Sequence, residues 1–142
     1  MSISHILVPI DGSDESKNAL ALSIGIAEKF SAAIFLLHVA DWNTQMTSLD
    51  RVTMSGYIPS DILKEGYELL TEAARQIPKE IETKTAVIPG HPATIILEEA
   101  EKAAADLIVL GSRGLGAVKG LLLGSVSAAV IQKAPCPVLT TK

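Results

Sequence analysis

The sequence predicts an α/β protein: a single doubly wound domain with a five-stranded parallel sheet and helices on both faces. Apolar runs rich in branched residues alternate with longer stretches of helical period, which is typical of βαβ units around a parallel sheet. The runs HILVPI, IFLLHV and LIVL are almost continuously apolar, as strands are when helices cover both sides of them. With 142 residues the chain has the length of one domain, so we expect residues 1–142 to fold as one unit.

Five apolar runs define the expected strands. The third run, IETKTAVI, alternates more between polar and apolar residues, so we expect it nearer an edge of the sheet. In chain order, the predicted strands cover residues 3–10, 33–39, 81–88, 107–110 and 138–141.

Capping residues and prolines mark the ends of the expected helices. Ser13 is a good N-cap for the first helix, and acidic residues follow it in the first turn. Pro78 stops the second helix, and Pro92 is well placed as the first residue of the third. The predicted helices cover residues 14–29, 60–77, 92–104 and 125–134.

The second expected helix carries one apolar stripe. Its apolar residues repeat at steps of four and three, which places them on one face of a helix. The predicted buried stripe consists of Leu63, Tyr67, Leu70, Ala74 and Ile77.

The connection over residues 40–59 is longer than most loops of a compact domain and shows no clear period. Loops of this length are commonly lids, partner-binding segments or locally disordered segments. The sequence leaves the role of this loop open.

Composition and charge argue against several classes of function. The chain has 12 basic and 16 acidic residues, a net charge of -4, and no basic stripe, which disfavours binding to nucleic acid. No segment approaches the roughly 20 apolar residues of a membrane helix, and the first residues lack the basic region of a signal peptide. The single Cys136 can form no internal disulfide, which suits a reducing compartment. We therefore expect a cytoplasmic protein that binds neither nucleic acid nor membrane.

The sequence offers no catalytic constellation. No group of His, Cys and Asp residues has metal-site spacing, and no nucleophile and base can be paired. His38 lies inside a buried strand, so we expect it to be a hydrogen-bonded core residue. Cys136 stands between two prolines in an apolar segment and is expected to pack as a small hydrophobic residue.

The stretch GSRGLGAVKGLLLGSVS, residues 111–127, is rich in glycine and directly follows the fourth strand. Glycine lets backbone N–H groups turn toward an anion, and the following helix N-terminus adds partial positive charge, so the arrangement favours phosphate. It is not a Walker loop, because Ala117 stands at the place of the required lysine. It also misses the dinucleotide pattern G-x-G-x-x-G, because Lys119 stands at the place of the third glycine.

The pattern that does fit is Gly111-x2-Gly114-x9-Gly124-Ser125, and it resembles the pattern of the nucleotide-binding universal stress proteins. The resemblance extends along the chain through HILVPIDGSDES, LIVLGSRG and LLGSVSAAVIQKAPCPVL. It implies the strand order 3-2-1-4-5, ATP or another adenine nucleotide as ligand, and a homodimer paired through the last strand, residues 138–141.

The resemblance also implies a binding site at the carboxyl ends of the strands. Gly111 and Gly114 would pass close to the ribose and first phosphates, and the residues from Gly124 onward would form a cup of N–H groups and hydroxyls for the outer phosphates. The implied ATP-binding residues are Pro9, Asp11, Val39, Leu110, Gly111, Arg113, Gly114, Gly124, Ser125, Val126 and Ser127.

Individual roles follow from the same resemblance, and some have structural alternatives. Asp11 would face the ribose or a phosphate-bound Mg2+ or Mn2+, or could simply form a turn and helix cap. Val39 would offer backbone groups to the adenine edge, and Leu110 would pack on the base. Arg113 adds positive charge to the loop, where it could also be merely solvated. The glycines could serve only a tight turn and close packing of a helix against the sheet.

The function that this resemblance implies is that of an ATP-binding stress or signalling module. Backbone amides give affinity for phosphate but supply no general base, so we expect slow hydrolysis or none. The alternatives are a homodimeric regulatory interaction protein that does not use nucleotide and a slow ATPase.

Overall fold

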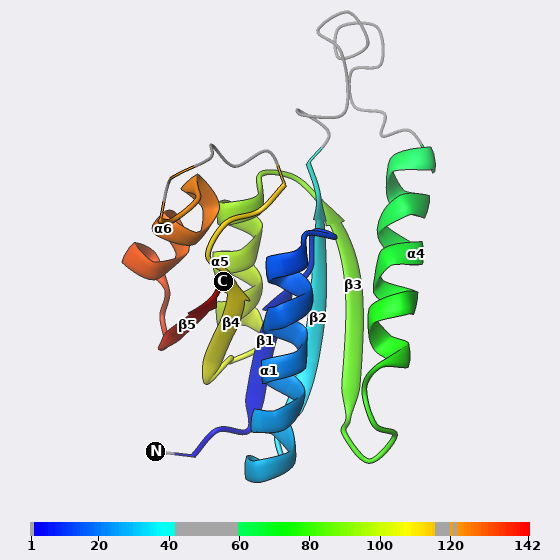
Figure 1. Cartoon of the computed structure of the whole chain (residues 1–142), viewed down its shortest axis with the longest axis vertical. Coiled ribbons are helices and arrows are strands. Elements are labelled where there is room, and N and C mark those ends of the chain that lie inside the picture. Colours follow the sequence, from blue (N-terminus) through cyan, green and yellow to red (C-terminus); the bar gives the residue numbers. More distant parts are fainter. Residues whose placement is uncertain (1, 42–59, 116–119, 121) are drawn as a thin grey trace, which may run out of the picture.

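The computed structural model describes residues 2–41, 60–115, 120 and 122–142. Its centre is a sheet of five strands, all paired in parallel, in the order β3-β2-β1-β4-β5 (Figure 1). The strands are β1 (His5–Pro9), β2 (Ala33–Ala40), β3 (Thr83–Pro89), β4 (Leu107–Gly111) and β5 (Val138–Thr141). The predicted fold class and strand order are confirmed, and the third strand is indeed at an edge.

In the described part of the chain, four helices cover the two faces of the sheet (Figure 1). They are α1 (Asp14–Phe30), α4 (Ser60–Arg75), α5 (Pro92–Lys102) and α6 (Ser125–Lys133). Helices α1 and α4 pack on one face, and α5 and α6 pack on the other. The long connection over residues 42–59 lies outside the described residues.

Helix α1 begins where the sequence predicts. The Ser13 side chain accepts a hydrogen bond from the N–H of Ser16 at 3.2 Å and so satisfies one of the free donors of the first turn. The helix ends at Ser31, which takes a left-handed conformation with φ of 55°.

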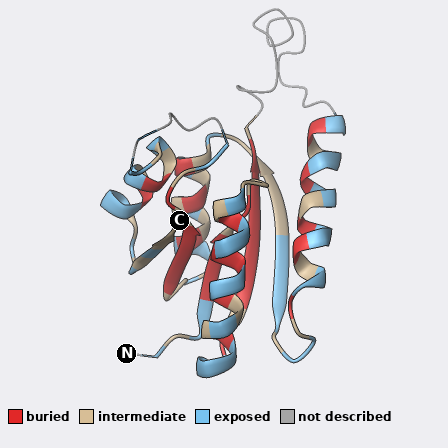
Figure 2. Cartoon of the chain, viewed as in Figure 1, coloured by how far each residue is buried: buried red, intermediate tan, exposed pale blue. Residues whose placement is uncertain are grey.

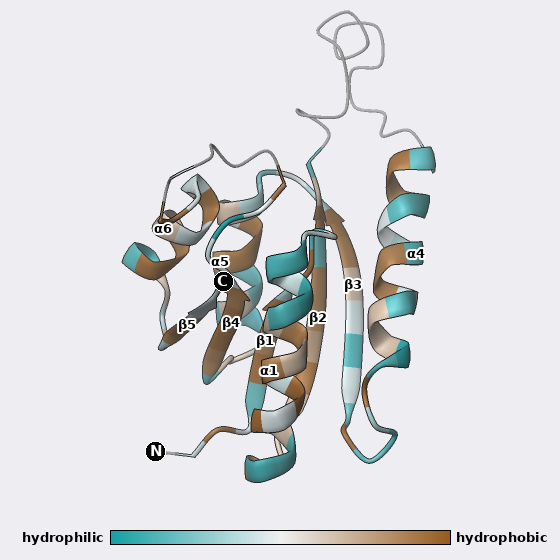
Figure 3. Cartoon of the chain, viewed as in Figure 1, coloured by the Kyte–Doolittle hydropathy of each residue, from teal (hydrophilic) through white to brown (hydrophobic). Residues whose placement is uncertain are grey.

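Two apolar layers hold the sheet between the helices. Along each central strand, successive side chains point to opposite faces, so Ile6 and Val8 join one layer and Leu7 joins the other. Figure 2 shows the buried residues concentrated in β1, β2 and β4, and Figure 3 shows that these strands are also the apolar ones. Sheet burial on both faces explains the continuous apolar runs of the sequence.

The predicted buried stripe of α4 is partly wrong. Leu70 and Ile77 are buried as expected, but Tyr67 is 58% exposed and Leu63 and Ala74 are only partly buried. The helix instead buries Ile62, Gly66, Leu70 and Ala73.

Gly66 is the physical reason for this difference. A Cβ at Gly66 would stand 2.7 Å from Cδ2 of His38 and 2.9 Å from Cγ1 of Val87, so only glycine lets α4 come this close to the sheet. Glycine is not counted in an apolar pattern, so the pattern does not reveal that Gly66 faces the sheet.

Asp106 joins the starts of β4 and β1. The backbone N–H groups of Ser4 and His5 donate to its Oδ2 at 2.8 and 3.0 Å. These two hydrogen bonds, together with the nearby His5 ring, hold the pKa of the Asp106 carboxyl below its ordinary value of 3.8.

We predict that Asp106→Asn lowers the midpoint of urea denaturation at pH 7. A carboxyl whose pKa is lower in the folded state stabilises the fold above its ordinary pKa, and this stabilisation is lost as the pH falls through the folded pKa. The gap between parent and variant should therefore shrink in urea titrations between pH 4 and pH 2. A gap that stayed constant from pH 7 to pH 2 would contradict the role of the charge.

Candidate functional site

A cleft of about 540 Å³ lies at the carboxyl ends of the strands. This is the place where open parallel sheets bind ligands. All of the predicted site residues line this strand-end cleft: Pro9, Asp11, Val39, Leu110, Gly111, Arg113, Gly114, Gly124, Ser125, Val126 and Ser127. The fold thus brings together residues that are up to 118 positions apart in the sequence, from Pro9 to Ser127.

One end of the cleft is the N-terminus of α6. Gly124 is the N-cap and offers no side chain to the first turn, and the first bond within the helix runs from the N–H of Ala128 to the carbonyl of Gly124 at 3.0 Å. The N–H groups of Ser125, Val126 and Ser127 therefore have no partner within the helix. Together with the helix dipole they make a site for an anion.

The hydroxyl of Ser127 differs from its expected role as a phosphate donor. Ser127 is buried, and its Oγ donates to the carbonyl of Ser112 at 2.5 Å. The same carbonyl accepts the N–H of Gly124 at 2.7 Å. The Ser127 hydroxyl therefore ties the start of α6 to the end of β4, which leaves its backbone N–H for an anion.

Two glycines of the pattern make close contacts within the protein. A Cβ at Gly111 would stand 2.8 Å from Cβ of Glu15 and 3.0 Å from its carbonyl carbon, so this glycine seats α1 against β4. A Cβ at Gly114 would stand 2.5 Å from Oδ2 of Asp11. Close packing thus gives these glycines a structural role of their own, and their closeness to a ligand stays a prediction.

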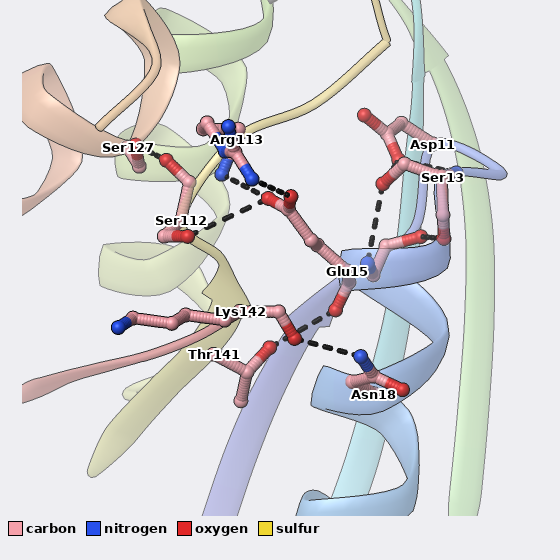
Figure 4. Close-up of polar contacts among 10 residues, drawn as sticks. Asp11, Ser13, Glu15, Asn18, Ser112, Arg113, Ser127, Thr141 and Lys142 are labelled. Carbon is pink, nitrogen blue, oxygen red and sulfur yellow. Dashed lines mark hydrogen bonds and ion pairs between the residues drawn. The ribbon is translucent and has the colours of Figure 1, made fainter. Parts of the chain in front are cut away.

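Asp11 forms both the turn and the bridge to the loop after β4. Its Oδ1 accepts the N–H and the hydroxyl of Ser13, at 2.9 and 2.5 Å (Figure 4). Its Oδ2 accepts the N–H of Leu115 at 3.1 Å. The Asp11 carboxylate therefore lines the cleft while it accepts hydrogen bonds from the protein itself.

Glu15 lies beside the loop that follows β4, although the sequence predicts it only as an acidic residue in the first turn of the first helix. Its carboxylate lies 3.0 Å from Nη2 of Arg113 and accepts the N–H of Arg113 at 2.6 Å. The side chain of Arg113, predicted as free positive charge or as solvated, is therefore held in an ion pair. Glu15 and Arg113 are 98 positions apart, and only the fold brings them together. No local pattern in either segment predicts this contact.

The end of β2 supplies backbone groups to the cleft. The N–H of Ile10 bonds the carbonyl of Leu37 at 2.8 Å, and the N–H of Gly90 bonds the carbonyl of Ala40 at 3.2 Å. Because successive residues of a strand face opposite neighbours, the N–H and C=O of Val39 face the β1 side, beyond the last residue of that strand. This orientation suits the predicted contact with the edge of a base.

The walls beside Val39 are apolar. Leu110 and Ile96 are buried in the layer below the cleft, and Val126 packs against the same layer. An apolar wall with a few aimed polar groups is the usual make-up of a small-molecule site.

The structure also describes His38 and Cys136, the two residues that the sequence predicts to pack in the core. His38 is buried and its Nδ1 lies 2.7 Å from the carbonyl oxygen of Ile10, as expected for a core histidine. Cys136 packs against the α5 and α6 layer, and burial raises the pKa of its thiol. Lys119 and Ala117 lie outside the described residues.

Within the described part of the chain, no three His, Cys, Asp or Glu side chains gather as a metal site would require. No helix in that same part is both long enough and apolar enough to cross a membrane.

Known proteins resemble this chain over its whole length. A model of the Universal stress protein family matches residues 2–142. Universal stress protein YxiE of Bacillus subtilis (strain 168) is 36% identical over 148 aligned positions, and the alignment covers 98% of this chain and 99% of that protein.

Solved structures agree with the sequence comparison. Universal stress protein UspA from Lactobacillus plantarum superposes with a TM-score of 0.81 at 27% identity, covering 100% of this chain and 99% of that chain. A universal stress protein in complex with cAMP gives a TM-score of 0.64 at 26% identity, covering 100% of this chain and 98% of that one. The chain belongs to the universal stress protein family.

Proposed function

We propose that this protein binds ATP or another adenine nucleotide in the strand-end cleft and acts as a nucleotide-dependent stress or signalling module. The observation that carries the proposal is the first turn of α6, whose N–H groups at Ser125, Val126 and Ser127 lack helical partners and line the cleft. The relative in complex with cAMP, a cyclic adenine nucleotide, supports the same ligand class for this chain.

The two ends of the cleft suit the two ends of such a ligand. Apolar Leu110 and Ile96 offer a surface for a base, and the backbone of Val39 lies beside them. The phosphates would lie at Ser125, where the helix dipole favours negative charge. The volume of about 540 Å³ falls in the usual range for small-molecule sites.

A divalent cation, Mg2+ or Mn2+, fits the donor set only with the phosphates present. Asp11 is the carboxylate of the predicted site, and its oxygens already accept bonds from Ser13 and Leu115. The cation would screen the phosphates from this carboxylate.

The donors of the first turn of α6 are N–H groups, which hold a phosphate but remove no proton from water, so we expect slow hydrolysis or none.

The assembly that we propose is a cytoplasmic homodimer joined through β5, with no nucleic acid or membrane as partner. β5 is at one edge of the sheet, and Leu139 in it is 38% exposed. A bare edge strand is a template for pairing with another chain, which supports pairing with a second copy. Sedimentation of the purified protein would measure this assembly directly.

Calorimetric titration of the nucleotide-free protein tests the proposal. Protein unfolded and refolded without nucleotide should bind ATP with Mg2+, AMP or cAMP with micromolar dissociation constants. Mass spectrometry of the protein before stripping should find adenine nucleotide released on denaturation. No heat with any of the three ligands at millimolar concentration would sink the proposal and favour an interaction protein that uses no nucleotide.

A further inference from the structure

The side chain of Glu15 reaches from the first turn of α1 to the loop that follows β4 (Figure 4). Its Oε1 lies 3.0 Å from Nη2 of Arg113, and its Oε2 accepts the backbone N–H of Arg113 at 2.6 Å. The Oγ of Ser112 lies 3.5 Å from the same Oε2. One carboxylate thus holds both the backbone and the charge of Arg113.

Packing fixes this carboxylate in place. The Glu15 side chain is 18% exposed and the Arg113 side chain 36% exposed, so the pair is partly shielded from water. The backbone of Glu15 also lies so close to Gly111 that no Cβ fits between them. A shielded pair with a second hydrogen bond is stronger than the usual pair of two solvated side chains.

Arg113 stands where the phosphates are proposed to bind. It is the one lysine or arginine among the described residues that line the strand-end cleft. Its Cα would lie 3.4 Å from a Cβ built on Gly124, the N-cap of α6. The charge of Arg113 therefore adds to the helix dipole in setting how strongly the phosphate end of the cleft responds to the charge of a ligand.

Building on the proposed nucleotide site, we infer that Glu15 is a positioning residue that sets specificity. By neutralising Arg113, it leaves phosphate to be held by the N–H groups and dipole of α6, so the site gains less from each further phosphate charge than it would beside a free guanidinium. An unpaired guanidinium would instead favour ATP over AMP, because its attraction grows with the charge of the ligand.

The experiment measures dissociation constants of ATP and AMP in low salt without divalent cations. Glu15→Gln keeps an oxygen for the N–H of Arg113 and frees the guanidinium, so the preference for ATP over AMP should rise about tenfold. Arg113→Gln leaves the Glu15 carboxylate unpaired and should lower the same preference. The double variant should return close to the parent, and added salt should reduce both shifts.

Asp14→Asn is the matched control. Asp14 lies in the same helical turn and loses the same charge, but its side chain is 98% exposed and its nearest cation is Lys17 at 4.0 Å. This variant should keep the ATP to AMP preference of the parent within about twofold.

The outcomes separate the inference from the proposed function. If the parent binds both nucleotides and Glu15→Gln behaves like Asp14→Asn, the inference is wrong and the proposed function stands. If the parent binds neither nucleotide with or without Mg2+, both are wrong. Thermal unfolding of each variant checks its fold. Should Glu15→Gln fail to fold, the opposite shift expected of Arg113→Gln still decides, since an unchanged preference in that variant would overturn the inference.

Discussion

Gly111→Ala is expected to lower the free energy of unfolding by about 1 to 3 kcal/mol, the usual cost of overpacking. The new Cβ would stand 2.8 Å from Cβ of Glu15, 3.0 Å from its carbonyl carbon and 3.1 Å from the backbone nitrogen of Ser16. These atoms belong to the first turn of α1, so relief requires the helix to move away from β4. Urea denaturation followed by circular dichroism measures the loss.

Gly25→Ala is the matched control for this substitution. Gly25 lies inside α1, and a Cβ built there meets no atom within 4 Å. The alanine should raise the free energy of unfolding by about 0.5 to 1 kcal/mol, because glycine is the poorer residue inside a helix. If Gly111→Ala were as stable as the parent, the close contact between α1 and β4 would be wrong.

Much of the fold could be predicted because its causes are local. Ser13 caps its own helix, α1, Pro92 is the first residue of α5, and continuous apolar runs predict strands that are buried on both faces. The order of the strands did not come from such local signals. It came from the resemblance of the glycine pattern and its flanks to a known family.

The features that were missed depend on contacts between distant segments. The buried face of α4 differs from the predicted stripe because Gly66 packs closely against His38 of β2 and Val87 of β3. The ion pair of Glu15 and Arg113 likewise joins two segments that are distant in the sequence. The periodicity of a sequence describes one helix or strand, whereas these contacts depend on the shape of the neighbouring element.

The hydroxyl of Ser127 shows the same limit within the site itself. The glycine pattern placed this residue correctly at the cleft, yet the pattern does not tell which of its polar groups remains available. The carbonyl of Ser112 takes the hydroxyl, and only the fold puts that carbonyl there. Sequence could thus predict the members of the site better than their individual tasks.

Ser125→Glu is expected to weaken binding of ATP by at least about 100-fold while leaving the fold as stable as before or more stable. Ser125 is the first residue of α6, is exposed and lines the strand-end cleft. A glutamate there faces the positive end of the helix dipole, which should add about 0.3 to 1 kcal/mol to the free energy of unfolding. The same carboxylate would repel a phosphate from the N–H groups of the first turn.

The opposite signs of these two effects are what make Ser125→Glu decisive. Most substitutions that abolish binding also weaken the fold, whereas this one separates the site from the scaffold. Ser125→Gln has the same length without the charge and should lose much less affinity, so calorimetry on the pair distinguishes repulsion from steric blocking. Equal losses in both variants would show crowding at Ser125 rather than electrostatic exclusion of phosphate. Unchanged affinity in Ser125→Glu would mean that the phosphates lie elsewhere, because a carboxylate and a phosphate cannot share the same few N–H donors.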